Sequence, residues 1–306
     1  MPDPVLLGKA FAAAAAVAML VVLLANRSGR AGVASAGATA AVVAAAFVGL
    51  WVLGLLPHWP PHDAIDRLLV VVLPAAAGTE ILAVLSPRAA WLGRCAVALG
   101  ATPVLLLGST YVTDLSGPGS RAWSQSETWT VFVALAIVLL AVWAALNRLA
   151  VRTGGRGTLL CVGGAALGSA AVVMMSGYAT GGQFGVPLAA ALLGIAFGSL
   201  VRRAAPGNDA AVGVGVVALF GLLLVARLFA ELTTFDAILL FAAPLLTWLP
   251  ELLPARRGVR PLLRLVLAAV PVVVAVILAH EKFVAGSARP AAGSGGSIED
   301  YMNFGK

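Results

Sequence analysis

The chain alternates long apolar runs with short segments that hold most of its charged residues. Within runs such as 11–24 and 131–146 every position is apolar, so these segments have no polar face to turn toward water. A helix needs about 20 apolar residues to cross the hydrocarbon core of a bilayer, whereas a transmembrane β-strand shows about 10 residues of alternating polarity. The pattern therefore predicts an all-α fold, a polytopic transmembrane helical bundle.

Prolines and glycines mark most boundaries between the runs, for example at Pro57, Pro87, Gly154 and Pro206. They divide the chain into ten expected spans, at residues 5–24, 33–56, 68–85, 90–112, 128–149, 158–178, 184–201, 210–232, 235–253 and 262–279. The boundary between the eighth and ninth spans has the weakest breaker signal. Pairs of glycines at helical spacing, at 164 and 168 and at 194 and 198, predict close helix packing within the chain or between chains.

Arginines are distributed unequally between successive loops. When helix-end arginines are counted with the adjoining loop, the odd-numbered loops hold Arg27, Arg30, Arg88, Arg94, Arg148, Arg152, Arg156, Arg202, Arg203, Arg256, Arg257, Arg260 and Arg264, and the even-numbered loops hold Arg67, Arg121 and Arg227. Positive residues are retained on the cytoplasmic side of a membrane. We therefore expect the odd loops in the cytoplasm and both termini outside it, and the alternation also supports the count of ten spans.

Composition narrows the class of protein further. Hydrophobic residues make up 61% of the 306 and charged residues 11%, against about 25% charged in a typical soluble domain. The net charge of +7 does not indicate a nucleic-acid partner here, because the arginines lie in loops where they set topology and meet anionic lipid of the bilayer. We expect a multi-pass protein of the cell (inner or plasma) membrane. Cys95 and Cys161 lie in apolar runs and provide neither a disulfide framework nor a cysteine metal site.

The two ends of the chain differ in character. The first span resembles a cleavable signal peptide in its small apolar residues and in the motif at 34–36, but two intervening arginines favour a retained span. Residues 1–285 are expected to form the transmembrane domain, and residues 286–306, rich in Gly, Ser, Ala and Pro, a flexible tail. Aromatic and acidic residues at the end of the tail leave docking on a protein partner as an alternative.

Two parts of the chain match at an offset of 170 residues. Asp66, Pro74 and Arg94 meet Asp236, Pro244 and Arg264, and Glu80 and Glu251 match one residue out of register. These matches predict a parallel duplication of about four helices, 1–112 and 184–285, with 128–178 inserted between them. Transporter folds often contain repeats, although a chain so rich in Ala, Leu and Val also matches itself by chance.

Ionisable side chains inside spans are costly, by roughly 2.5 to 3.5 kcal/mol on insertion scales, and usually find partners or line a path. Glu80 in the third span and Arg94 in the fourth are such residues, and antiparallel neighbours bring them together; Glu251 and Arg264 form the second pair. In the functional interpretation Glu80 binds a proton or a cation. In the structural interpretation, which we favour, the pair is a buried ion pair that holds two helices in register.

The outer ends of the spans carry a second set of polar residues. Arg227 and Glu231 are four residues apart, which predicts a local salt bridge near Asp236. The proline-rich loop at 57–67 concentrates His58, His62 and Asp66. Two histidines with carboxylates suggest a metal site, but no third strong ligand is evident, and we expect no metal and instead a rigid interfacial loop anchored by its tryptophan.

No nucleotide-binding, metalloprotease or serine-hydrolase motif occurs in the chain. We therefore expect no enzyme and no cofactor. Two functions remain: a transporter or permease for a small solute or a lipid-like substrate, and a non-catalytic membrane subunit or scaffold of a larger complex. A homo-oligomer is compatible with both.

Overall fold

Helices are the only regular secondary structure in the residues described by the computed structural model, which are 3–112, 123–201, 209–252 and 259–288. The helices are α1 (Pro4–Ala25), α2 (Ala31–Leu53), α3 (Ala64–Arg67), α4 (Leu73–Leu85), α5 (Pro87–Leu106), α6 (Gln125–Thr153), α7 (Arg156–Met175), α8 (Ala179–Val201), α9 (Asp209–Phe229), α10 (Thr234–Ala242), α11 (Leu249–Leu252) and α12 (Arg260–Ala288). They make ten spans long and apolar enough to cross a membrane. The predicted all-α bundle of ten spans is confirmed, and the chain is an integral membrane protein.

Span boundaries follow local backbone chemistry. Ser124 caps α6, accepting a hydrogen bond from the backbone N–H of Glu127, whose side chain accepts in return from the Ser124 N–H. Thr233 caps α10, its hydroxyl oxygen accepting a hydrogen bond from the backbone N–H of Asp236. The uncertain boundary between the eighth and ninth spans therefore falls between Phe229 and Thr234. The helix of the last span runs on to Ala288, past the expected end at 279, and residues 289–306 of the expected tail lie outside the described residues.

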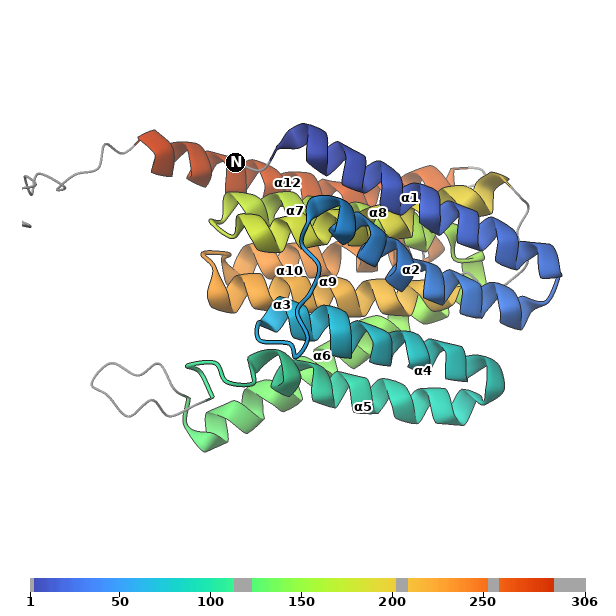
Figure 1. Cartoon of the computed structure of the whole chain (residues 1–306), viewed down its shortest axis with the longest axis horizontal. Helices are drawn as coiled ribbons and strands as arrows, with labels where there is room; N and C mark the ends of the chain where they lie inside the picture. The colour runs from blue at the N-terminus through green and yellow to red at the C-terminus, as the bar shows by residue number, and fades with distance from the viewer. Residues whose placement is uncertain (1–2, 113–122, 202–208, 253–258, 289–306) are drawn as a thin grey trace, which may run out of the picture.

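Successive spans run in opposite directions (Figure 1). The ends of α1, α4, α6, α8 and α11 and the starts of α2, α5, α7, α9 and α12 therefore lie at one end of the bundle, at the right of the view, which we name the arginine-rich end. It carries the described arginines Arg27, Arg30, Arg88, Arg148, Arg152, Arg156 and Arg260, while Arg202, Arg203, Arg256 and Arg257 lie outside the described residues. The other end, which holds the start of α1, is named the opposite end. The side of the membrane that each end faces stays a prediction.

The helices α8 and α9 form the centre of the bundle, because 78% of the residues in the apolar stretch of each are buried. The helices α1 and α12 are peripheral, with 22% of the corresponding residues buried. Small residues bring the backbones together. A Cβ on Gly194 of α8 would lie 2.4 Å from the carbonyl oxygen of Ala15 in α1, and one on Gly168 of α7 would lie 2.2 Å from Val272 of α12. Close packing within the chain is confirmed at these two glycines and at Gly198. A Cβ on Gly164 would have no atom of the described chain within 4 Å, so packing between chains at that position stays a prediction.

Two of the ten spans change from α to another helix type in mid-span. The third consists of α3, a π-helical segment η2 (Leu68–Val72) and α4, and the ninth of α10, a 3-10 segment η3 (Ala243–Trp248) and α11. A proline accompanies each departure. Pro74 follows the π-helical segment, whose turn is disturbed by the proline ring and by the missing N–H, and Pro244 is the second residue of the 3-10 segment. We name these two units the broken spans.

Candidate functional site

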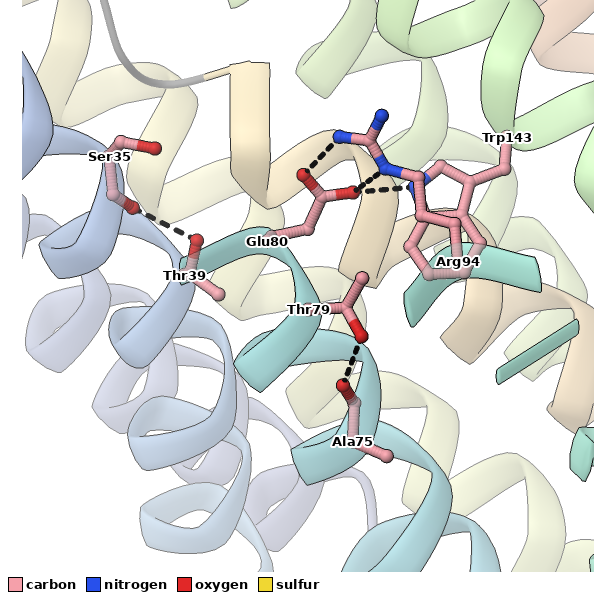
Figure 2. A network of polar contacts seen from close by, with 7 residues as sticks. All are labelled: Ser35, Thr39, Ala75, Thr79, Glu80, Arg94 and Trp143. Atoms are coloured by element: carbon pink, nitrogen blue, oxygen red, sulfur yellow. Dashed lines mark hydrogen bonds and ion pairs between the residues drawn. The ribbon is translucent and has the colours of Figure 1, made fainter. Parts of the chain in front are cut away.

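A buried polar cluster lies between α4, α5 and α6, toward the arginine-rich end (Figure 2). Glu80 of α4, 1% exposed, receives two hydrogen bonds from the Arg94 guanidinium of α5, from Nε to Oε1 at 3.0 Å and from Nη2 to Oε2 at 2.7 Å. Trp143 of α6 donates its indole N–H to the same Oε1 at 2.7 Å. Both carboxylate oxygens are therefore occupied by hydrogen-bond donors.

The guanidinium of Arg94 is also held on its other sides. Its Cζ lies 6.0 Å from the centre of the Trp143 ring, which permits a cation–π interaction. With its amide oxygen turned toward the guanidinium, Asn147 accepts from Nη2 at 2.7 Å and from Nη1 at 3.3 Å. The result is a bidentate pair with its hydrogen-bonding capacity largely satisfied inside the protein. Such an arrangement suits a fixed link between helices better than a site that exchanges protons.

Two glycines make room for this cluster. A Cβ on Gly213 of α9 would lie 2.3 Å from Trp143 Nε1 and 2.4 Å from Glu80 Oε1. Glycine at this position therefore allows α9 to pack directly against the cluster. A Cβ on Gly93 of α5 would lie 2.9 Å from the methyl group of Thr79, which allows α4 and α5 to approach. Gly78 of α4 plays no such part, because nothing lies within 4 Å of a Cβ placed on it.

The second expected pair forms at the corresponding end of the ninth span. Arg264 of α12 donates to Glu251 of α11, and Arg260 lies 3.9 Å from the other carboxylate oxygen. This pair is less enclosed than the first, because the Glu251 side chain is 23% exposed and that of Glu80 is 1% exposed. The structure thus joins Glu80 to Arg94 and Glu251 to Arg264. Their role in binding an ion or a substrate stays a prediction, as does the repeat.

At the opposite end each broken span begins with a buried aspartate. Asp66 of α3 is 4% exposed and Asp236 of α10 is 2% exposed. Asp66 lines a pocket of about 420 Å³, and Asp236 lines one of about 330 Å³ together with Glu231 and Lys282. Each aspartate retains one carboxylate oxygen without a hydrogen-bond partner, Oδ2 of Asp66 and Oδ1 of Asp236. Buried polar atoms without a partner are uncommon in folded proteins, and the two residues that carry these oxygens both line pockets.

The partners of these residues differ from those expected. Asp236 is paired with Lys282 of α12 at 3.0 Å and accepts from the Thr233 hydroxyl. The predicted Arg227–Glu231 salt bridge is wrong: Arg227 donates to Thr234 at 2.7 Å, and no ion pair joins it to Glu231 within the described part of the chain. The reason is that α9 ends at Phe229, so Glu231 lies beyond the helix and does not share its face.

The histidine-containing loop places only one imidazole against a carboxylate. His58 Nδ1 lies 3.4 Å from Asp66 Oδ2, whereas His62 contributes its backbone carbonyl to Arg67. Within the ranges that the structure describes, no group of three or more His, Cys, Asp or Glu side chains is arranged to hold a metal ion. Trp59 is 78% exposed, an orientation that suits the expected contact with the membrane interface.

Several residues that build these sites were not among the sequence candidates. Trp143, Asn147 and Gly213 belong to spans distant in sequence from Glu80. Of the three, only Trp143 could have been suspected from the sequence, because it brings an N–H donor into the apolar run 131–146. Lys282 was overlooked because it lies past the expected end of the last span. In comparisons with known proteins, no family model and no curated protein matches the chain.

Proposed function

We propose that the protein is a secondary transporter or permease for a small solute. The observation that carries the proposal is the likeness of the two broken spans: each departs from α geometry, begins with a buried aspartate that faces a pocket, and ends in a Glu–Arg pair. Irregular backbone at membrane depth is tolerated where it is enclosed by protein or lines a cavity. In transporters, interrupted helices at corresponding positions of two halves point to the binding site.

The arrangement of the broken spans around α9 supports relative movement. Helices α3 and α4 of one broken span and α10 of the other all contact α9, so the central helix touches both broken spans. A segment whose backbone hydrogen bonds are already rearranged bends at lower cost than a continuous helix. We infer that η2 and η3 act as the flexible points about which the ends of these spans move.

The two ends of the bundle then have different roles. The pockets of about 420 Å³ and 330 Å³ open the opposite end, and their size suits a small solute better than a lipid. The Glu80–Arg94 and Glu251–Arg264 pairs link adjacent helices near the arginine-rich end and hold that end closed. With the arginine-rich end in the cytoplasm, as the distribution of positive charge favours, the described conformation is closed toward the cytoplasm.

Alternating access can be tested without knowing the substrate. After replacement of the two cysteines, spin labels at His62 and Glu281 report the width of the opposite end, and labels at Arg88 and Val259 report the arginine-rich end; all four positions are exposed. We expect Glu80→Gln to lengthen distances at the arginine-rich end and to shorten them at the opposite end. Glu127→Gln, which removes an exposed carboxylate and keeps a capping-box side chain, is the control.

The outcome separates the two functions. Single, sharp distances at both ends that do not respond to Glu80→Gln would contradict a transporter and favour a membrane subunit or scaffold. If Glu80→Gln is poorly folded, Trp143→Phe removes one hydrogen bond to Glu80 and retains an aromatic ring, so it weakens the same link more gently.

A further inference from the structure

The pocket that contains Asp66 lies where the end of α2, α3 and the start of α8 meet. Its volume is about 420 Å³, and its lining includes Trp51, Asp63, Asp66, Tyr178 and Phe184. Pockets of this size that combine aromatic walls with a few polar groups are typical of sites for small organic ligands. The charge of those polar groups determines which ligand fits.

Asp66 is the least exposed of the acidic groups in this pocket. It is 4% exposed, and its Oδ2 atom accepts no hydrogen bond. The basic group beside it is His58, whose Nδ1 lies 3.4 Å away and whose side chain is 80% exposed, so this neighbour is free to turn toward solvent. A buried carboxylate oxygen without a donor is costly. A ligand N–H group that takes the place of the exposed His58 imidazole would satisfy this oxygen.

The neighbouring arginine does not neutralise the pocket. Arg67 directs its guanidinium away, donating to the backbone carbonyls of Leu107 and His62. Asp63, at the N-cap of α3, makes no capping hydrogen bond with its side chain, so its carboxylate remains available to the pocket. The pocket therefore holds two carboxylates.

The Tyr178 phenol is affected by the negative charges of both carboxylates. Burial raises the pKa of its phenol, and the negative charges of Asp63 and Asp66 raise that pKa further. The phenol stays neutral and retains a hydroxyl group that can both donate and accept. It adds a polar contact without adding a charge that would repel or attract a ligand.

The remaining walls are apolar and aromatic. Trp51, Leu55, Ile65 and Phe184 line the pocket around the carboxylates. Aromatic faces attract cations through their quadrupole, and the same walls favour an apolar ligand body. An anion would meet two negative charges, and a neutral ligand would leave them without compensation.

From this juxtaposition we propose that the pocket binds a primary organic ammonium ion with a small apolar body, its N–H groups directed to Asp66 and Asp63. As a statement about the transported substrate the proposal rests on the function proposed above. As a statement about binding it does not depend on transport.

The test uses the full-length protein purified in mild detergent and titrated calorimetrically with benzylammonium. Benzyl alcohol, which has the same shape without the charge, measures partition into apolar regions, and benzoate measures the effect of the opposite charge. We expect benzylammonium to bind at least tenfold more tightly than benzyl alcohol, and benzoate not to bind.

Variants assign that binding to the pocket. Asp66→Asn should weaken benzylammonium binding at least tenfold, and Asp63→Asn, at an exposed position that does not endanger folding, should weaken it severalfold. Glu281→Gln removes one exposed carboxylate from α12 at the same end of the bundle and should leave binding unchanged. Equal binding of the ammonium ion and the alcohol, or equal loss in Asp63→Asn and Glu281→Gln, would overturn the proposal.

The two proposals fail separately. Binding that is lost in Asp66→Asn, combined with spin-label distances that never change, would leave the ammonium site standing and remove the transporter. Distances that alternate as expected, combined with no preference for benzylammonium, would remove the ammonium site alone.

Discussion

Replacement of Glu80 by glutamine should cost much more stability than its small change in shape suggests. The glutamine amide has one acceptor oxygen and one NH₂ group, so one of the two positions that now face Arg94 donors becomes a donor itself. The positive charge of Arg94, whose side chain is 16% exposed, then remains buried without its negative partner. Breaking a buried ion pair in this way typically costs about 3–5 kcal/mol.

A second substitution separates this cause from a simple packing defect. In the double variant Glu80→Gln with Arg94→Gln, two amides can bond to each other and Trp143 still finds an acceptor. Because no unpaired charge remains, we expect the double variant to be about 2 kcal/mol more stable than Glu80→Gln alone. Such a recovery is the signature of a charge left without its partner.

The free energy of unfolding can be measured by titrating the protein with SDS in mild detergent. Cys161 is buried, so in a Cys95→Ser background one thiol becomes reactive only when the chain opens, and its labelling reports unfolding. Glu281→Gln is the control and should change the free energy of unfolding by less than about 0.5 kcal/mol. A loss below about 1 kcal/mol for Glu80→Gln, or a double variant weaker than the single one, would refute the reasoning.

Three further predictions follow from single contacts and from the charge distribution. Gly213→Ala should lower the free energy of unfolding by about 1–3 kcal/mol, because its Cβ would lie 2.3 Å from Trp143 Nε1, whereas Gly164→Ala, with nothing within 4 Å, should be neutral or stabilising; equal stability of the two variants in the SDS titration would contradict the packing described. Tyr111→Phe removes a 2.8 Å hydrogen bond to the carbonyl of Leu228 and should cost about 1 kcal/mol in the same assay, and no measurable loss would mean that water replaces the hydroxyl. Alkaline phosphatase fused to the C-terminus should be active in a bacterial host and green fluorescent protein fused there should be dark; the reverse result would overturn the orientation.

The Glu–Arg pairs were predictable because each joins neighbouring spans. Two consecutive helices with a short connection pack antiparallel, so Glu80 and Arg94, at similar distances from the connection, meet whatever the rest of the bundle does. The same argument holds for Glu251 and Arg264. The Arg227–Glu231 prediction failed because it depended on the exact residue at which a helix ends, and helix ends are the least reliable part of a sequence prediction.

By itself, the sequence determined the all-α membrane class, the ten spans and the shared end of the arginine-bearing connections. These properties follow from the length of the apolar runs and from the uneven distribution of arginines between successive loops, and both can be read along the chain without knowing how the helices pack. Only the tertiary structure decided that Trp143 and Gly213 complete the Glu80 cluster, and that Asp66 faces a pocket closed by Tyr178. Apolar helices pack through small residues and shape, and lipid favours no particular neighbour, so the order of helices in the bundle has no local signal in the sequence.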